Sequence, residues 1–501
     1  MPLTATGTTV EVDTTAGRVR GRWRTDAAGH RSAAFLGIPF AEPPVGDLRF
    51  AAPVPHRPWQ GVRDALEYGA TAQRGDPGVT FIPEPSIPGE STLNVNVFTP
   101  APATDASAQA LLPVLVYIHG GGYFAGSPAS PWYDGAAFNR DGVVTVSISY
   151  RLGFDGFGWI ADAPMNRGVL DWLLALEWVR DNVASFGGDP SRVTIVGQSA
   201  GGGAVLTLLG MPRAQPLFAG VYSISGVAAD VTLERAESFG RRLAEAAGVQ
   251  PTRAGLSALS EERLREVQGE LSAREQGGSP FDELRRFIVG GLEFGPVIDG
   301  DVVPMRTVDA IAAGIGADKP LVLGATDDEF STILDGAKGK LRFVPARFLL
   351  GRAGLERAVR SPYLAANRDV TKLGSAAVVG RYLTDRLFRT LALRIARARG
   401  AAPTWLYRFS WASPISGRAV HCLDVPFFFD CLDAERVDVV AGDAPPQALA
   451  DEVHGGAVAF VTSGDPGWPR FTDAAGTVRV YDTTSTVVEH GFAAVRPLLS
   501  N

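Results

Sequence analysis

Apolar residues occur along this chain in two patterns, which predict two kinds of secondary structure. Short continuous apolar runs indicate buried strands, and those next to candidate chemistry are residues 115–118, 192–196, 321–324 and 405–409. A Gly- and Ala-rich run at 200–209 predicts a helix packed closely on the strand before it. Stretches with charges on one face and Leu or Ala on the other predict helices over 233–247, 256–271 and much of 344–398. We expect one α/β domain over residues 1–501, with helical insertions at approximately 230–290 and 344–398.

The turn between the second of these strands and its helix reads Gly197-Gln198-Ser199-Ala200-Gly201. A Gly-x-Ser-x-Gly sequence at a strand-to-helix turn raises the serine oxygen into a cleft, because the glycines permit a strained backbone and a close helix crossing. The pentapeptide alone is equally typical of an ordinary glycine turn, so its context decides. Ser199 is the candidate nucleophile.

Residues 119–123, His-Gly-Gly-Gly-Tyr, directly follow the strand at 115–118. Consecutive glycines can turn their N–H groups toward one point, since no Cβ blocks the approach, and acyl transfer requires such donors for its developing oxyanion. A flexible linker would not follow a strand and precede an aromatic residue. We expect this loop, braced by His119, to form an oxyanion hole with the N–H of Ala200.

A serine nucleophile needs a base, and the chain has only six histidines. Folds with this elbow place the base last in chain order, which leaves the histidines after Ser199. His490 lies in the tail, and His454 lies in a predicted surface helix, where a solvated side chain is expected. His421 remains, in a loop after the strand at 405–409.

The acid of the triad is expected between the serine and the histidine in the chain. Asp327, Asp328 and Glu329 directly follow the strand at 321–324. A carboxylate at the C-terminal end of a strand fits the third member of a triad. Chain position alone does not choose among the three.

Several longer motifs carry a further resemblance. They are FLGIPFAEPPVGDLRF (35–50), NRGVLD (166–171), FGGDP (186–190), HCLDVPF (421–427), and GDP with WP (464–469). Together they resemble the type-B carboxylesterases, the cholinesterase-like branch of the α/β-hydrolases, over about residues 10–475. The resemblance implies a central, mostly parallel twisted sheet flanked by helices, with the helical insertions walling an active-site gorge. It also implies a serine carboxylesterase that hydrolyses carboxylic esters through an acyl-enzyme intermediate.

The resemblance also assigns roles to single residues. In that family the acid is a glutamate in a strand-end Gly-x-x-x-Asp-Glu pattern, which matches residues 324–329 and selects Glu329. His421 is then the base and Ser199 the nucleophile. The implied oxyanion donors are Gly121, Gly122 and Ala200, and the implied supporting residues are Gln198 and Ser225.

Three positions can be compared with the family's usual pattern: two depart from it and one keeps it. Thr92 stands where a disulfide cysteine is common, and the partner region also lacks a cysteine. Glu90 is retained and is expected to pair with Arg49. Phe330 follows the glutamate where a glycine is frequent, and it can narrow the site or pack on the sheet.

Composition and charge exclude several other classes of protein. The net charge of −7, without a Lys/Arg cluster, argues against nucleic acid as a partner. The sequence has no run of 18 apolar residues, which a membrane span would require, and its N-terminus lacks signal-peptide features. We therefore expect a cytoplasmic enzyme. We also favour a monomer. Cys422 and Cys431 are the only cysteines, and no metal-ligand spacing occurs, so no metal or cofactor is expected. Cys422 is expected to be a small buried residue rather than a nucleophile.

The substrate is expected to be a small ester. Apolar walls near the site would suit an uncharged or aromatic ester, and the candidate pocket residues are Phe81, Phe124, Phe281, Phe330 and Phe427. Two alternatives stay open from the sequence. One is a lipase acting at interfaces, and the other is a non-catalytic cholinesterase-like binding domain.

Overall fold

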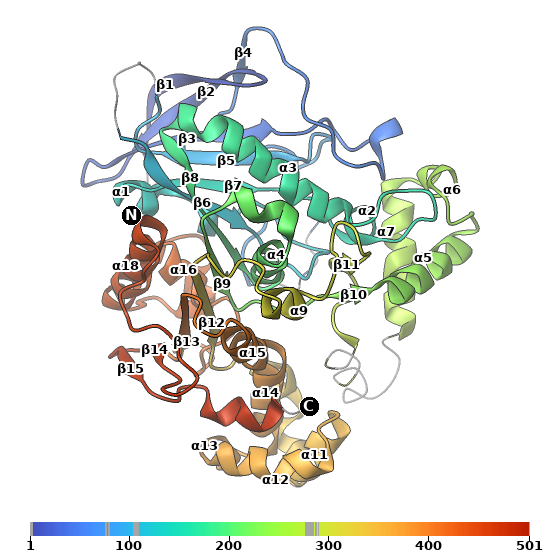
Figure 1. The fold of residues 1–501 in the computed structure, drawn as a ribbon, viewed down its shortest axis with the longest axis vertical. Helices are drawn as coiled ribbons and strands as arrows, with labels where there is room; N and C mark the ends of the chain where they lie inside the picture. Colours follow the sequence, from blue (N-terminus) through green and yellow to red (C-terminus); the bar gives the residue numbers. More distant parts are fainter. Residues whose placement is uncertain are drawn as a thin grey trace.

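A computed structural model describes residues 4–75, 78, 81–103, 110–275, 285, 288 and 290–499. A long sheet crosses the molecule (Figure 1) in the order β1-β2-β3-β5-β7-β6-β8-β9-β12-β13-β14-β15, with β4 paired to β2. Neighbouring strands are parallel from β7 to β14 and antiparallel at both ends of the sheet. The strands are β1 (Thr4–Thr14), β2 (Gly17–Thr25), β3 (Arg31–Pro39), β4 (Val62–Asp64), β5 (Asn94–Thr99), β6 (Leu112–Ile118), β7 (Val144–Ile148), β8 (Gly188–Gln198), β9 (Gly220–Ile224), β12 (Leu321–Thr326), β13 (Thr404–Phe409), β14 (Val478–Tyr481) and β15 (Thr486–Val488). A separate small parallel pair is formed by β10 (Val231–Thr232) and β11 (Val297–Ile298).

The central strands are buried on both faces, as their continuous apolar runs predict. Successive side chains of a strand point to opposite faces, so Val114 and Val116 of β6 pack into one core while Leu115 and Tyr117 pack into another. The first core also contains side chains of α3 (Arg167–Asn182), α4 (Ala200–Leu209) and α15 (Thr390–Ala398). The second contains side chains of α1 (Ala136–Arg140), α16 (Val425–Phe428) and α18 (Gln447–Ser463). Helices therefore cover both faces of a mostly parallel sheet.

The remaining helices lie mostly away from the middle of the sheet. In Figure 1, α5 and α7 stand to one side, and α11 to α13 gather at the lower end. Their bounds are α2 (Gly153–Phe157), α5 (Leu233–Ala247), α6 (Arg253–Ser257), α7 (Glu261–Glu275), α9 (Thr307–Ala312), α10 (Lys338–Leu341), α11 (Ala346–Arg352), α12 (Arg357–Ala366), α13 (Arg368–Thr371), α14 (Ser375–Thr384) and α17 (Val437–Ala441). A π-helical turn, Asp385–Arg389, connects α14 to α15. No helix in the described part of the chain combines the length and the apolar content that crossing a bilayer requires.

The predicted elements agree with this architecture, with one break. The four predicted strands lie within β6, β8, β12 and β13, and the predicted helix at 200–209 is α4. The single helix expected at 256–271 is divided into α6 and α7. Ser260 explains the break, because its hydroxyl accepts a hydrogen bond from the Arg263 N–H at 3.1 Å and so begins a new helix. The organisation as one domain with two helical insertions stays a prediction.

Candidate active site

Ser199 sits on a strained turn where β8 ends and α4 begins. Its φ of 58° is in a region that only glycine adopts readily. The flanking glycines make the turn possible: a Cβ on Gly197 would overlap the Gly201 carbonyl, and a Cβ on Gly201 would overlap the carbonyl of Ile118. The Ser199 N–H donates to the Ile224 carbonyl at 2.9 Å, which fixes the turn on β9. The local sequence therefore holds the hydroxyl at the carboxyl end of the sheet.

The three predicted triad residues form one hydrogen-bonded chain. His421 Nε2 lies 3.0 Å from Ser199 Oγ, and His421 Nδ1 contacts Glu329 Oε2 in a short hydrogen bond. The backbone adds a further link, since the His421 N–H donates to the Glu329 carbonyl at 3.0 Å. Glu329 follows β12 and His421 lies in the loop after β13, so neighbouring parallel strands deliver both to the same edge.

Glu329 is buried, and its second oxygen is held by two donors. Oε1 accepts from Ser225 Oγ at 2.6 Å and from the Thr326 N–H at 2.7 Å. These bonds aim the other oxygen at the imidazole. Ser225 therefore lies where the family resemblance placed a supporting residue.

The two aspartates before Glu329 face elsewhere. Asp327 is bound by Arg389, Arg408 and the Ser410 hydroxyl, and Arg408 contacts both of its carboxylate oxygens. Although burial opposes ionisation of Asp327, these arginines hold its pKa well below the usual range. Asp328 contacts Arg381 at 3.4 Å. Of the three acidic candidates, Glu329 is the one that contacts His421.

The charge around His421 favours its protonated form. Burial opposes the imidazolium, but a negative charge beside the ring outweighs burial and raises the pKa of His421 above its usual value. Burial also raises the pKa of the Cys422 thiol, so the thiol is neutral near pH 7. The charge that stabilises the imidazolium is therefore that of Glu329.

Gln198 completes the surroundings of the imidazole. Its Nε2 lies 3.2 Å from His421 Nε2 and 3.2 Å from Cys422 Sγ. In the neutral imidazole with its proton on Nδ1 facing Glu329, the single lone pair of Nε2 is shared between the Ser199 hydroxyl and the Gln198 amide. Within the described residues, no group of three or more His, Cys, Asp or Glu side chains is placed to hold a metal ion.

The glycine loop lies against the serine turn. A Cβ added to Gly120 would come within 3.1 Å of the Ser199 Cβ. Gly121 and Gly122 have positive φ values of 93° and 62°, and the Gly121 carbonyl accepts from the N–H groups of Phe124 and Ala125. Among the hydrogen bonds of the described residues, none uses the N–H of Gly121, Gly122 or Ala200. The three N–H groups that the sequence predicts as oxyanion donors are therefore unengaged in the described part of the chain.

His119 braces this loop, as expected. Its ring stacks on Tyr150 at 4.5 Å, and the Tyr150 hydroxyl donates to the His119 carbonyl at 3.0 Å.

The phenylalanines predicted to line the pocket differ in their position and burial. Phe330 packs on the His421 ring with centroids 4.7 Å apart, and Phe388 lies on the same ring at 5.3 Å. Phe81 and Phe124 are exposed, whereas Phe427 is fully buried against Phe409 and Trp411 and so belongs to the core rather than to a pocket. Phe281 lies outside the described residues.

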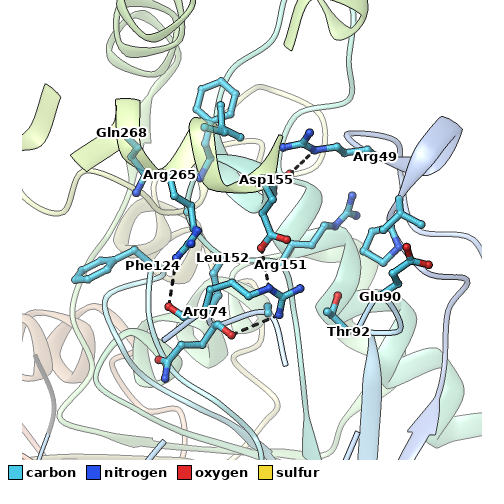
Figure 2. A pocket seen from close by; sticks show the side chains of 18 of the residues that line it. Arg49, Arg74, Glu90, Thr92, Phe124, Arg151, Leu152, Asp155, Arg265 and Gln268 are labelled. Carbon is cyan, nitrogen blue, oxygen red and sulfur yellow. Dashed lines mark hydrogen bonds and ion pairs between the residues drawn. The ribbon is translucent and has the colours of Figure 1, made fainter. Parts of the chain in front are cut away.

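A cavity of about 670 Å³ lies beside Phe124 (Figure 2). Its wall carries Arg49, Arg74 and Arg265, with carboxylates between them. Neither Ser199 nor His421 lines it. The cavity therefore lies next to the residue that follows the glycine loop, and it does not contain the triad side chains Ser199 and His421.

Two expectations about charged residues are wrong. Arg49 pairs with Asp155 at 3.3 Å and not with Glu90, because α2 brings Asp155 to the guanidinium while Glu90 stays exposed. His454 is not solvated: it is buried in α18, with Nδ1 2.8 Å from the Phe428 carbonyl and Nε2 3.0 Å from Asp141. α18 packs against α16, which contains Phe428, so this contact joins segments that are separate in the sequence.

Comparisons with known proteins agree with this geometry. A model of the Carboxylesterase family matches residues 8–493. The chain belongs to the carboxylesterase family. It is 32% identical over 499 residues to para-nitrobenzyl esterase of Bacillus subtilis (strain 168), covering 95% of each chain. It is 35% identical over 461 residues to phenmedipham hydrolase of Pseudarthrobacter oxydans, covering 87% of this chain and 89% of that one.

Solved structures show the same fold. A para-nitrobenzyl esterase superimposes with a TM-score of 0.80 at 29% identity over 98% of this chain and 99% of that one. A Geobacillus stearothermophilus carboxylesterase gives 0.80 at 31% identity, over 97% and 99%. The predicted α/β-hydrolase fold is thereby confirmed, and so is membership of a family of enzymes that hydrolyse carboxylic esters through a serine acyl-enzyme.

The sequence analysis missed Gln73, Tyr150 and the backbone N–H of Thr326 as neighbours of the site. Tyr150 carried a weak signal, an aromatic residue just after a buried strand. Gln73 carried none, because nothing in a polar loop shows which distant backbone group it will contact.

Proposed function

We propose that this carboxylesterase uses Ser199 as nucleophile, His421 as general base and Glu329 as the acid that orients it. The hydrogen-bonded chain from Ser199 Oγ through both imidazole nitrogens to Glu329 Oε2 is the observation that carries this proposal. His421 Nε2 takes the hydroxyl proton as Ser199 Oγ forms a bond to the ester carbonyl carbon. The imidazolium then returns that proton to the departing alcohol, which leaves the acyl group on Ser199.

Water completes the cycle by the same route. His421 accepts a proton from water, the oxygen attacks the acyl carbon, and the proton passes to Ser199 Oγ as the carboxylic acid leaves. We assign the oxyanion formed in each half to the N–H groups of Gly121, Gly122 and Ala200, which are unengaged in the described part of the chain. Such preorganised donors stabilise charge that develops only in the transition state.

The supporting residues fix the orientation of the Glu329 carboxylate and the His421 imidazole. Ser225 and Thr326 fix the Glu329 carboxylate, and Gln198 contacts His421 Nε2 from the side away from Glu329. A non-catalytic binding domain would not require a complete triad with a held carboxylate.

We propose an uncharged, aromatic or otherwise apolar ester as substrate. Phe330 and Phe388 cover the imidazole, and Phe124 follows the glycine loop, so the reacting carbonyl would meet apolar surface. Phe81, which is exposed, stays a candidate pocket residue. A relative is named for a para-nitrobenzyl ester, which agrees with this class. The monomeric state and the cytoplasmic location stay predictions.

The test is Ser199→Ala, with Ser223→Ala as the matched control. Ser223 is a buried serine on the next strand, and its hydroxyl donates to Gly202 rather than to the triad. Ser199→Ala should keep its melting temperature and lose roughly 10⁵-fold or more in kcat, with residual rate from the oxyanion donors and binding. An organophosphate should label Ser199 with one group per chain. An active Ser199→Ala, or labelling at another residue, would refute the mechanism.

A further inference from the structure

A buried glutamine, Gln73, is distant in sequence from the glycine loop and forms a hydrogen bond to Gly126, just after that loop. Gln73 lies in the segment 71–92 and is only 4% exposed. Its Oε1 accepts from the Gly126 N–H at 2.6 Å, and its Nε2 donates to the Glu84 carbonyl at 2.6 Å. Both ends of the amide are therefore engaged, and the Glu84 carbonyl fixes which end faces Gly126.

Gly126 is in direct contact with the start of the same loop. Its φ is +109°, and a Cβ there would overlap the His119 imidazole and approach the Gly120 carbonyl. His119 is held on its other face by the Tyr150 ring. A shift of Gly126 would therefore displace Gly120, and with it the N–H groups of Gly121 and Gly122.

The segment that carries Gln73 is closed by hydrogen bonds. The Thr71 N–H donates to the Ile87 carbonyl at 3.0 Å, and the Ile87 N–H donates to Thr71 Oγ1 at 2.8 Å. Asn94 Nδ2 donates to the carbonyls of Ala70 and Ser91 at 2.8 and 2.9 Å. This closure fixes the neck of the segment. The Thr71 hydroxyl also donates to the Gln73 carbonyl at 3.2 Å. This bond involves the backbone of Gln73 and not its side-chain amide, so the two can be perturbed by different substitutions.

We propose that Gln73 is a positioning residue that sets the oxyanion donors of Gly121 and Gly122 through its hydrogen bond to Gly126. The proposal rests on the oxyanion role given to this loop above. Misaligned donors bind the neutral substrate carbonyl almost as before, but they bind the oxyanion less well. Loss of the Gln73 bond therefore lowers kcat and leaves KM nearly unchanged. Removing one oxyanion donor costs about 10²–10³ in kcat, so misaligning two is expected to cost about 10- to 100-fold.

The test compares two substitutions of Gln73 with a control at the neck. Gln73→Met keeps the side-chain volume and removes the strong acceptor. Gln73→Glu keeps an oxygen for the Gly126 N–H. Thr71→Val removes the hydroxyl that accepts from the Ile87 N–H and donates to the Gln73 carbonyl, and it leaves the side-chain amide of Gln73 and its bond to Gly126 unchanged.

Each variant is measured with p-nitrophenyl acetate and with a trifluoromethyl ketone, which adds to the serine to form a tetrahedral oxyanion. For Gln73→Met, kcat should fall about 10- to 100-fold, and the Ki of the ketone should rise by the same factor. KM should change by less than about two-fold, and titration of acylatable serine should still give one per chain. Gln73→Glu should recover part of both losses, and Thr71→Val should leave the Ki unchanged.

Two outcomes would overturn the proposal. In the first, kcat falls only in proportion to the number of titratable serines while the Ki stays that of wild type, which is the result of partial unfolding. In the second, Thr71→Val raises the Ki as much as Gln73→Met does. If Gln73→Met does not fold, Gln73→Asn replaces it with the same expected Ki, because its shorter side chain cannot reach Gly126. A wild-type enzyme that the ketone does not inhibit would instead refute the proposed function itself.

Discussion

Glu329→Gln tests the identity of the triad acid, which is the assignment that adjacent residues in the sequence support least. The substitution keeps the length of the side chain and removes its charge. The new amide oxygen can keep both bonds that Oε1 now accepts, from Ser225 at 2.6 Å and from the Thr326 N–H at 2.7 Å. The amide nitrogen then faces His421 Nδ1. Since two N–H groups cannot face each other, the imidazole proton is forced onto Nε2.

The expected loss follows from that change of tautomer. His421 Nε2 is the atom 3.0 Å from Ser199 Oγ, and once it carries a proton it cannot accept another. In a comparable triad, an amide in place of the acid lowers kcat by about 10⁴, which equals about 5.5 kcal/mol of transition-state stabilisation. Folding is affected much less. With the proton on Nε2, Nδ1 accepts from the new amide N–H, so all three side-chain hydrogen bonds can form. The free energy of unfolding should therefore change by no more than about 2 kcal/mol.

The assay is kcat for p-nitrophenyl acetate, with the melting temperature measured beside it and Asp328→Asn as the matched control. Asp328 is the adjacent carboxylate and contacts only Arg381 among the ion pairs of the described residues. Asp328→Asn should keep kcat within about three-fold, since exposed or partly exposed ion pairs contribute little. A Glu329→Gln enzyme within ten-fold of wild type, or a deeper loss in Asp328→Asn without unfolding, would refute this assignment of the acid.

Three further outcomes follow from the charges around the site. First, kcat/KM should rise with pH through an ionisation above about 6.5, the ordinary histidine pKa. The reason is that the proposed base acts in its neutral form and that the Glu329 charge raises the pKa of His421. A midpoint below pH 6 in the wild-type enzyme would contradict this prediction. Second, Asp327→Asn should destabilise the fold by about 1–3 kcal/mol in urea unfolding, since it weakens the contacts of Arg408 and leaves Arg389 with Asp385 as its charged partner; a variant as stable as wild type would show that the ion pairs contribute nothing. Third, burial and then the Glu329 charge raise the pKa of Asp424 to about 7, against about 3.9 in the unfolded chain. Folding therefore favours the protonated acid, and stability falls as pH rises from about 4 to about 7. Asp424→Asn should be more stable than wild type at pH 8, by at most about 4 kcal/mol, and the gain should shrink at pH 5; equal melting curves at pH 8 would refute it.

The parts of the site that could be predicted are those whose geometry is written in a few adjacent residues. The Ser199 turn and the 119–123 loop depend on glycines that permit particular backbone angles, so their sequence and their shape coincide. Side chains that meet only in the folded chain could not be found in that way. Chain order left three acids after β12, and only the family resemblance preferred Glu329. The pairing of Arg49 with Asp155, and the burial of His454 against α16, depend on how separate segments pack.

Glu329, the proposed acid, needs more support from its neighbours than Ser199, the proposed nucleophile. Ser199 is fixed by its own backbone, whose φ of 58° leaves the side chain little choice of direction. Glu329 has a flexible side chain and a charge that burial opposes, so its direction must come from partners. Ser225 and the Thr326 N–H supply two hydrogen bonds to one oxygen, and the imidazole supplies the third bond to the other. Phe330 and Phe388 keep water from the imidazole, which strengthens its attraction to the carboxylate. The site is thus built from one locally determined residue and two that the sheet must bring together.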